Sequence, residues 1–299
     1  CENDVSLETV VLPVKLSEIQ NYAFSNCKKL NIEKIGGTYD GLTYEVIIGG
    51  HSFYNCENIK KLSITLSRFE GDSSFENCIN LESVEFEYNK PMFNGSYTFR
   101  NTALKSVELT RGTMFDARAR GTYMDCKKLV SVNMTGVEAC PYMFAGCISL
   151  KLENVHIDSI GEFNGYPSGI FKDIPMETVY IEKNSGQIGI EAFNTIGTKE
   201  YIVEEGNQFY SAIDGMLVQG ANLMQFNSGR TGDVIIPKQI TRISSSSMTN
   251  GSIDALYIHA GVTVIDPYAI SLDVKDIYFE GNTIPFDNSI IVGENTVVH

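Results

Sequence analysis

The chain has 299 residues, with 23 Lys and Arg against 37 Asp and Glu, which gives a net charge of −14 and a pI of about 4.7. This acidity argues against nucleic acid or anionic lipid as a ligand, because both are bound by basic faces. No apolar run approaches the length of a transmembrane helix, and no cationic start followed by an apolar run indicates a signal peptide.

A short phrase returns along the chain: an aromatic residue, two residues, a Cys, two residues and an aliphatic residue. Its first copy runs from Phe24 through Cys27 to Leu30. The aromatic positions of the successive copies are Phe24, Phe53, Phe75, Phe99, Tyr123, Phe144, Phe171 and Phe193. Steps of about 20–29 residues are typical of leucine-rich repeats, so the spacing predicts a solenoid.

Some copies are degenerate or displaced. Thr102, Ile174 and Ile196 stand in the place of the Cys. Two weaker copies, at Met248 and Ile270, follow after an anomalous step that is about two periods long. We therefore expect an insertion between Phe193 and Met248.

Each copy combines two patterns. The segment after the Cys, as in 81–87, alternates apolar and polar residues and predicts one short strand a repeat, and hence a stacked parallel sheet. The segment before the aromatic residue, as in 19–24, suggests a helical or 3₁₀ turn that directs the ring inward. These patterns predict an α/β repeat solenoid with the sheet on one face and short turns or 3₁₀ segments on the other.

The unit resembles the BspA-like leucine-rich repeats of bacterial cell-surface proteins. The resemblance rests on 12–19 with Phe24 and Cys27, and on a second good copy that opens at 236–243. It implies a right-handed superhelix, here one solenoid over 1–299 with about ten repeats. It also implies a β-hairpin insertion at about 207–228, where Asp214-Gly215 is a strong turn signal.

The cysteines have a structural interpretation. Cys27, Cys56, Cys78, Cys126 and Cys147 share one place in the repeat. We expect these five to be buried, reduced and unligated, because a free Cys packs as a small apolar residue. Cys140 lies outside that place and should be more accessible. Cys1 has two interpretations: a lipidated N-terminus of a mature lipoprotein, or the Cys of a truncated first repeat, which we slightly favour.

No catalytic chemistry can be assigned. The four histidines belong to no recognisable motif, and the acidic residues recur at a repeat position, as expected of a solvated strand face. We therefore expect no enzyme, no cofactor and no metal site.

The exposed face of the predicted sheet is the candidate ligand face. Strand alternation directs two columns of side chains outward, beginning at Ser63 and Thr65. Their C-terminal half sets aromatic residues beside acids, and the candidate residues are Tyr180, Glu182, Ile202, Glu204, Tyr257, His259, Tyr278 and Glu280. Exposed aromatics are typical contact anchors, although tyrosine also simply suits a strand.

The sequence and the resemblance together predict a non-enzymatic, cell-surface or secreted adhesion module. Its expected partner is an unknown protein or glycan on a host or neighbouring cell, and the chain is expected to be a monomer on the outer face of a bacterium, anchored or secreted. A structural spacer that displays other domains is the alternative, and a carbohydrate-binding role ranks below both.

Overall fold

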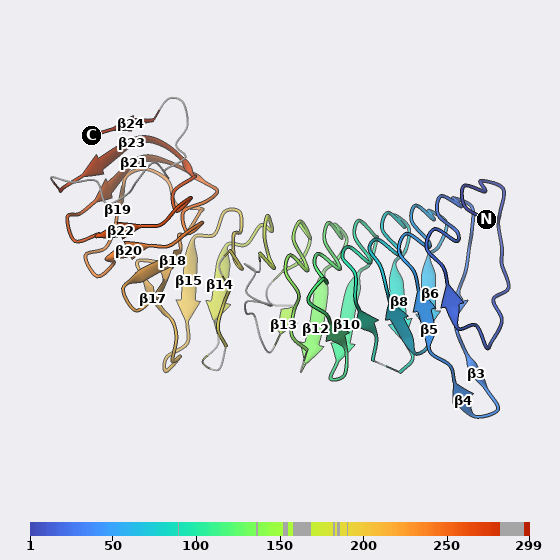
Figure 1. The fold of residues 1–299 in the computed structure, drawn as a ribbon. Helices are drawn as coiled ribbons and strands as arrows, with labels where there is room; N and C mark the ends of the chain where they lie inside the picture. The colour runs from blue at the N-terminus through green and yellow to red at the C-terminus, as the bar shows by residue number, and fades with distance from the viewer. Residues whose placement is uncertain are drawn as a thin grey trace. The chain divides into compact units, whose positions relative to one another are not determined.

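The computed structural model describes residues 1–88, 90–135, 137–151, 155–157, 169–181, 183, 186–189, 191–281 and 296–299. Two compact units divide the chain, Cys1–Phe171 (unit 1) and Lys172–His299 (unit 2). Throughout the described ranges, all regular elements are β-strands and none is a helix. The predicted α/β class and 3₁₀ segments are therefore wrong, and the fold is a β-solenoid of stacked coils (Figure 1).

Unit 1 contains thirteen of the described strands. They are β1 Glu18–Ile19, β2 Lys34–Ile35, β3 Thr38–Tyr39, β4 Leu42–Thr43, β5 Val46–Ile48, β6 Lys61–Ile64, β7 Ser67–Phe69, β8 Ser83–Phe86, β9 Met92–Phe93, β10 Ser106–Thr110, β11 Met114–Phe115, β12 Ser131–Thr135 and β13 Val155–Ile157.

Successive coils of unit 1 contribute to parallel sheets on two sides. One side has the order β1-β5-β7-β9-β11, and the other carries β2-β6-β8 and β10-β12-β13. A coil such as 61–77 thus supplies β6 to one side and β7 to the other before it reaches its turn. The expectation of one strand a repeat is wrong, because the short apolar pairs after the first strand also pair with their neighbours.

The third side of each coil is a turn that carries the aromatic residue. In the first full copy, Phe24 lies between Tyr22 and Asn26, which both have left-handed backbone conformations with φ of 59° and 61°. The backbone N–H of Phe24 donates to Ser52 O of the next coil at 2.8 Å. Bonds between coils therefore extend along this side, which is why the segment forms a turn ladder and not a helix.

The aromatic residues stack in one row inside unit 1, as predicted. Adjacent ring centroids are 4.8 Å apart for Phe53 and Phe75 and 5.8 Å apart for Tyr123 and Phe144, with planes within about 10°. The row extends from Phe24 to Phe171. Because the rings are almost fully buried from Phe53 onward, they supply much of the apolar area that holds the coils together.

The repeated cysteines form a second internal row. All five are buried, and none forms a disulfide. Each thiol donates to a carbonyl of the preceding coil, as when Cys78 Sγ donates to Phe53 O at 3.2 Å. Burial raises the pKa of Cys56 to about 12, so the thiol stays protonated.

Two cysteine expectations are wrong. Cys140 is fully buried beside the Thr122 hydroxyl, and burial raises its pKa to about 11. Cys1 does not take the place of the repeat Cys. Its carbonyl accepts the Cys27 thiol, as Phe24 O accepts that of Cys56, and Asn3 at φ 61° matches Asn26. Cys1 therefore lies where other coils have the aromatic residue.

Unit 2 contains the remaining strands. They are β14 Thr178–Ile181, β15 Glu200–Val203, β16 Ser211–Ile213, β17 Met216–Gln219, β18 Asn222–Gln225, β19 Val234–Ile235, β20 Arg242–Ile243, β21 Ser252–Ile258, β22 Val264–Ile265, β23 Asp273–Phe279 and β24 Val297–Val298.

The sheets of unit 2 have the orders β14-β15, β16-β17-β18-β20-β22 and β19-β21-β23-β24. Strands β16 and β17 pair antiparallel across a turn at Asp214 and Gly215, both at positive φ, and β18 then pairs in parallel with β20. A second hairpin, β3–β4 in unit 1, turns at Asp40-Gly41 and explains the long first step of the repeat.

Candidate binding face

The predicted ligand face is divided between two sheets of unit 2. Tyr180 pairs with Ile202 on β14 and β15, and both side chains are exposed. Tyr257 pairs with Tyr278 on β21 and β23, in another sheet. Glu182 lies outside the described residues. The sequence predicted one face, but the structure has two separate pairs of residues on two sheets.

The second pair belongs to a larger row, which we call the tyrosine ladder: Ile235, Tyr257, Tyr278 and His299. Ile235 lies opposite Tyr257 in the parallel register of β19 and β21. The ring centroids of Tyr257 and Tyr278 are 4.8 Å apart, and those of Tyr278 and His299 are 4.4 Å apart, with planes within 9°. Each of four adjacent strands or strand ends thus contributes one side chain.

Both ends of the tyrosine ladder, Ile235 and His299, were absent from the predicted ligand face. Ile235 is 65% exposed. It lies in the opening segment of a repeat, whereas the predicted columns contained only residues of the strand that follows the repeat Cys. His299 follows β24, and the backbone N–H of His299 donates to Ile277 O at 2.8 Å. The regular step from Tyr257 to Tyr278 could have been extended by one further coil to find it.

Stacking decides what the tyrosine ladder offers to a ligand. The two tyrosine rings cover each other's faces, and His299 covers the second face of Tyr278. Both tyrosines are nevertheless only half-buried. The accessible parts are therefore ring edges and polar tips, which suit hydrogen bonding better than face-on stacking.

Acidic groups surround the tyrosine ladder. Asp276 Oδ1 lies 2.9 Å from His299 Nε2. Partial desolvation, followed by the nearby Asp276, Tyr257 and Asp233, raises the pKa of the Tyr278 phenol. In sequence, unit 2 has sixteen Asp and Glu against seven Lys and Arg, so it carries −9 of the chain's −14. The face therefore favours cationic ligands.

Other predicted site residues have structural roles. His259 is half-buried; its Nδ1 accepts the N–H of Gly261 at 3.0 Å, and its Nε2 lies 3.2 Å from Pro237 O. Glu204 accepts the N–H of Lys183 at 2.8 Å. Glu280 is exposed, and its backbone N–H donates to Ile258 O. Of the two carboxylates, that of Glu204 is engaged by Lys183, whereas that of Glu280 has no contact among the described residues.

The outer face of β2-β6-β8 in unit 1 is polar and internally paired. Glu87 accepts from Lys34 Nζ at 2.7 Å and from Ser63 Oγ at 2.6 Å, and this lowers its carboxyl pKa. Thr65, predicted to point outward from this face, is buried and donates to Ile35 O. The prediction that the second outward column begins at Thr65 is therefore wrong, because the chain turns there toward β7.

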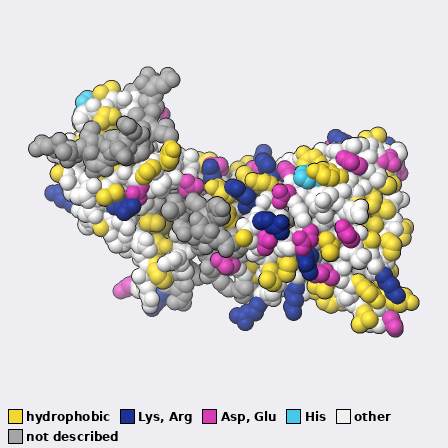
Figure 2. Space-filling model, viewed as in Figure 1, with side chains coloured by type: hydrophobic (Ala, Val, Ile, Leu, Met, Phe, Trp, Pro, Cys, Tyr) yellow, Lys and Arg dark blue, Asp and Glu magenta, His cyan; other side chains and the backbone are white. Residues whose placement is uncertain are grey.

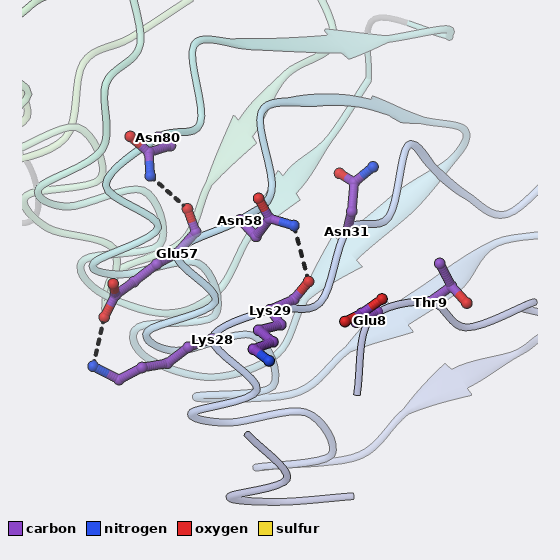
Figure 3. Close-up of a pocket in the computed structure, with 8 residues that line it drawn as sticks. All are labelled: Glu8, Thr9, Lys28, Lys29, Asn31, Glu57, Asn58 and Asn80. Atoms are coloured by element: carbon purple, nitrogen blue, oxygen red, sulfur yellow. Dashed lines mark hydrogen bonds and ion pairs between the residues drawn. The ribbon is translucent and has the colours of Figure 1, made fainter. Parts of the chain in front are cut away.

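A shallow polar groove of about 520 Å³ lies at another edge of unit 1. In Figure 3, Glu57 pairs with Lys28, and the amides of Asn58 and Asn80 donate to backbone carbonyls of preceding coils. Its lining is Glu8, Thr9, Lys28, Lys29, Asn31, Glu57, Asn58 and Asn80. These contacts join coils to each other and bring no nucleophile and base together.

Metal sites and membrane spans can be considered for the described part of the chain alone. No group of three or more His, Cys, Asp or Glu side chains there is arranged to hold a metal ion. None of the described segments forms a helix that is long and apolar enough to cross a membrane.

The repeat pattern matches the model of the BspA type leucine rich repeat region over residues 1–129, 46–166, 116–211 and 219–291. The chain belongs to this family. The matches cover the coils of unit 1 that carry the stacked aromatic residues and the strands of the tyrosine ladder up to Tyr278. A search of curated proteins found no significant match.

Three solved structures are similar to this BspA-type chain, and the first of them supports the solenoid fold. A leucine rich cell surface protein from Faecalibacterium prausnitzii A2-165 is 16% identical with a TM-score of 0.50, covering 90% of this chain and 71% of that one. Pneumococcal vaccine antigen PcpA is 14% identical with a TM-score of 0.41, covering 98% and 83%. A leucine-rich repeat protein from Bacteroides ovatus ATCC 8483 is 18% identical with a TM-score of 0.35, covering 92% and 56%.

Proposed function

We propose that this chain is a non-enzymatic binding module of a bacterial cell surface, which attaches to another protein through the tyrosine ladder. The observation that carries the proposal is the ladder itself: Ile235, Tyr257, Tyr278 and His299 in register on neighbouring strand segments. Rigid strands present these side chains at little cost in entropy, and tyrosine is a frequent anchor of protein interfaces.

The chemistry of the tyrosine ladder favours a protein over a glycan as the partner. A sugar ring that packs on an aromatic residue needs an open ring face, and both faces of Tyr278 are occupied. Hydroxyl groups, ring edges and the carboxylates of Asp233 and Asp276 suit a cationic, hydrogen-bonding protein surface instead. We therefore propose a basic protein segment as the partner, with adhesion to a host or neighbouring cell as the role.

The proposed location is the extracellular face of a bacterium, anchored or secreted. Family membership supports it, as does the fold likeness to a protein described as a leucine rich cell surface protein. Attachment of lipid at Cys1 stays a prediction, and that residue is exposed. The mass of the protein purified from its native source tests this directly, because acylation adds the mass of the acyl chains.

A spacer role is the second candidate, and one observation favours it. The rows of rings, thiols and inter-coil backbone bonds in unit 1 make a continuously bonded body that could display another domain without binding anything itself.

Photo-crosslinking separates the two candidates. A benzophenone side chain placed at Ile235 samples the tyrosine ladder, and one placed at Val264, an exposed position on β22 of another sheet, is the matched control. A discrete protein adduct from host or neighbouring-cell surfaces at position 235, absent at position 264, supports binding through the ladder. The same adducts at both positions, or none at either, support the spacer.

A further inference from the structure

Two arginines of unit 1 lie over tyrosine rings on the turn side of the coils, but their surroundings differ. The Arg100 guanidinium carbon is 5.3 Å from the ring centroid of Tyr97, and that of Arg120 is 5.1 Å from the ring centroid of Tyr142. A cation held over an aromatic face is attracted by the ring quadrupole, so each ring orients its guanidinium.

Arg100 is already neutralised within the chain. Its Nε donates to Asp125 Oδ2 at 3.0 Å, and its Nη1 lies 3.5 Å from Glu76 Oε1. These two carboxylates engage the Nε and Nη1 groups of Arg100, which an external carboxylate would otherwise contact. Arg100 is thus a complete internal ion-pair network.

Arg120 has the ring but not the carboxylates. Its side chain is exposed, and within the described ranges no Asp or Glu lies within ion-pair distance of it. A guanidinium presents a planar fork that matches a carboxylate in a two-point contact. The ring therefore orients the fork of Arg120, and no carboxylate of the described residues pairs with it.

The backbone at Tyr142 and at Gly169 determines where the Tyr142 ring lies. Tyr142 adopts φ 56°, a conformation that costs a bulky residue free energy. A Cβ on Gly169, the equivalent residue of the next coil, would lie 2.6 Å from Tyr142 Cε1, so that glycine leaves room for the ring. Both features hold the ring that orients Arg120.

The surrounding charge is opposite in sign to that of the whole chain. Residues 100–128 contain seven Lys and Arg against three Asp and Glu, a net +4 in a chain of −14. Figure 2 shows both Lys or Arg and Asp or Glu side chains over the middle of unit 1. Three of these cations pair with carboxylates: Arg100 with Glu76 and Asp125, Lys105 with Glu82, and Arg118 with Asp116. The remaining excess of cationic residues in this stretch favours an anion as the ligand of Arg120.

From these observations we propose that Arg120, seated on Tyr142, is a carboxylate-binding subsite that takes a Glu or Asp side chain from an acidic segment of a partner protein. A protein source is favoured because tyrosine, arginine, asparagine and glycine along these turns resemble the composition of protein-binding loops. This subsite is separate from the tyrosine ladder, lies in the other unit and selects the opposite charge.

The test measures binding of a fluorescent oligoglutamate peptide to the full chain by anisotropy at low ionic strength. Arg120→Ala should weaken binding about tenfold, equal to about 1.4 kcal/mol. Arg120→Lys keeps the charge but loses the fork, and should weaken binding nearly as much. The control Arg118→Gln removes a nearby charge that already pairs with Asp116, and should change affinity by less than about twofold.

Tyr142→Gly tests whether the tyrosine ring orients Arg120, because it removes the ring and leaves the arginine in place. Glycine adopts φ 56° freely, so the turn should still fold, while binding should weaken several-fold. Equal losses in the Arg118 and Arg120 variants would mean a diffuse electrostatic effect and would overturn the subsite. Stronger binding of a sulfated glycan than of oligoglutamate would overturn the assignment to a protein carboxylate.

Discussion

Tyr257 and Tyr278 lie directly opposite each other on the parallel strands β21 and β23, with ring centroids 4.8 Å apart and planes 9° apart. This relationship follows from the period of the chain. The two residues are one repeat of 21 apart, so stacking of coils at the spacing of β-strands also stacks their side chains. Any residue type that recurs at one place in this solenoid becomes a row.

Stacking predicts energetic coupling between these two tyrosines. In a double-mutant cycle with Tyr257→Ala and Tyr278→Ala, the free energies of unfolding should be non-additive by about 0.5–1.5 kcal/mol, as for other aromatic pairs. The control cycle pairs Tyr180→Ala with Tyr278→Ala, whose rings lie on different sheets, and should be additive. Equal coupling in both cycles would contradict the structure.

The buried ring row predicts a large cost for removing one member. Phe75→Ala should lower the free energy of unfolding of unit 1 by about 3–5 kcal/mol, because the ring is fully buried between Phe53 and Phe99. Ile79→Ala, four residues later and 45% exposed, should cost less than about 1 kcal/mol. Chemical denaturation compares the two, and similar losses would argue against the row.

We predict that Gly95 cannot be replaced by a larger residue, because a side chain there would clash with the backbone of the preceding coil. A Cβ at this position would lie 2.2 Å from Gly71 O of the preceding coil, so Gly95→Ala must push two coils apart. We expect several kcal/mol of destabilisation or loss of folded protein. Gly41→Ala is the control, because a Cβ there meets nothing within 4 Å and pays only for its positive φ. Thermal unfolding of the pair decides the matter.

The buried thiol of Cys56 predicts a loss of stability at alkaline pH. The pKa of Cys56 is raised from 9.0 to about 12, so the unfolded chain loses this proton at lower pH than the folded one. The stabilisation is complete below about pH 9 and declines as the pH approaches 12, by up to about 1.4 kcal/mol per pH unit for this group. Cys56→Thr should show a shallower alkaline decline in urea unfolding, and an unchanged slope would contradict the assignment.

Thiol labelling of the native protein provides a separate check on burial. Of the seven cysteines, Cys1 alone is exposed, so we expect one fast-reacting thiol and six slow ones. The earlier expectation from sequence would give two fast thiols, with Cys140 as the second. Peptide mapping after brief alkylation distinguishes these results.

The sequence predicted the repeat, the inward ring row and the buried repeat cysteines, because each depends on one residue recurring at one spacing. Phe53, Phe75 and Cys78 could be aligned with their equivalents by counting. The second strand of each coil was not predicted. Segments such as β9, Met92–Phe93, have only two residues, too few for an alternating pattern to emerge, and become strands through pairing with neighbouring coils.

The missed site residues have similar physical reasons. By residue type, Cys1 aligns with the repeat cysteines. The left-handed conformation of Asn3 matches that of Asn26, so Cys1 instead aligns with the aromatic residue Phe24. The sequence predicts an accessible Cys140 because Gln20, Gly49 and Gly71 stand at this place in other copies, but the thiol is fully buried beside the Thr122 hydroxyl. The binding face is divided because the segment with β16 to β18 separates Tyr180 from Tyr257 in sequence and joins β20 and β22 in another sheet.

Hydrogen–deuterium exchange of the full chain with its crosslinked or purified partner tests the central claim most directly. The account predicts that the partner slows exchange in peptides covering β19, β21 and β23 and the segment at His299, and that Tyr257→Ala with Tyr278→Ala abolishes this protection while both units stay folded. Protection that appears on other strands and persists in the double variant would contradict binding through the tyrosine ladder.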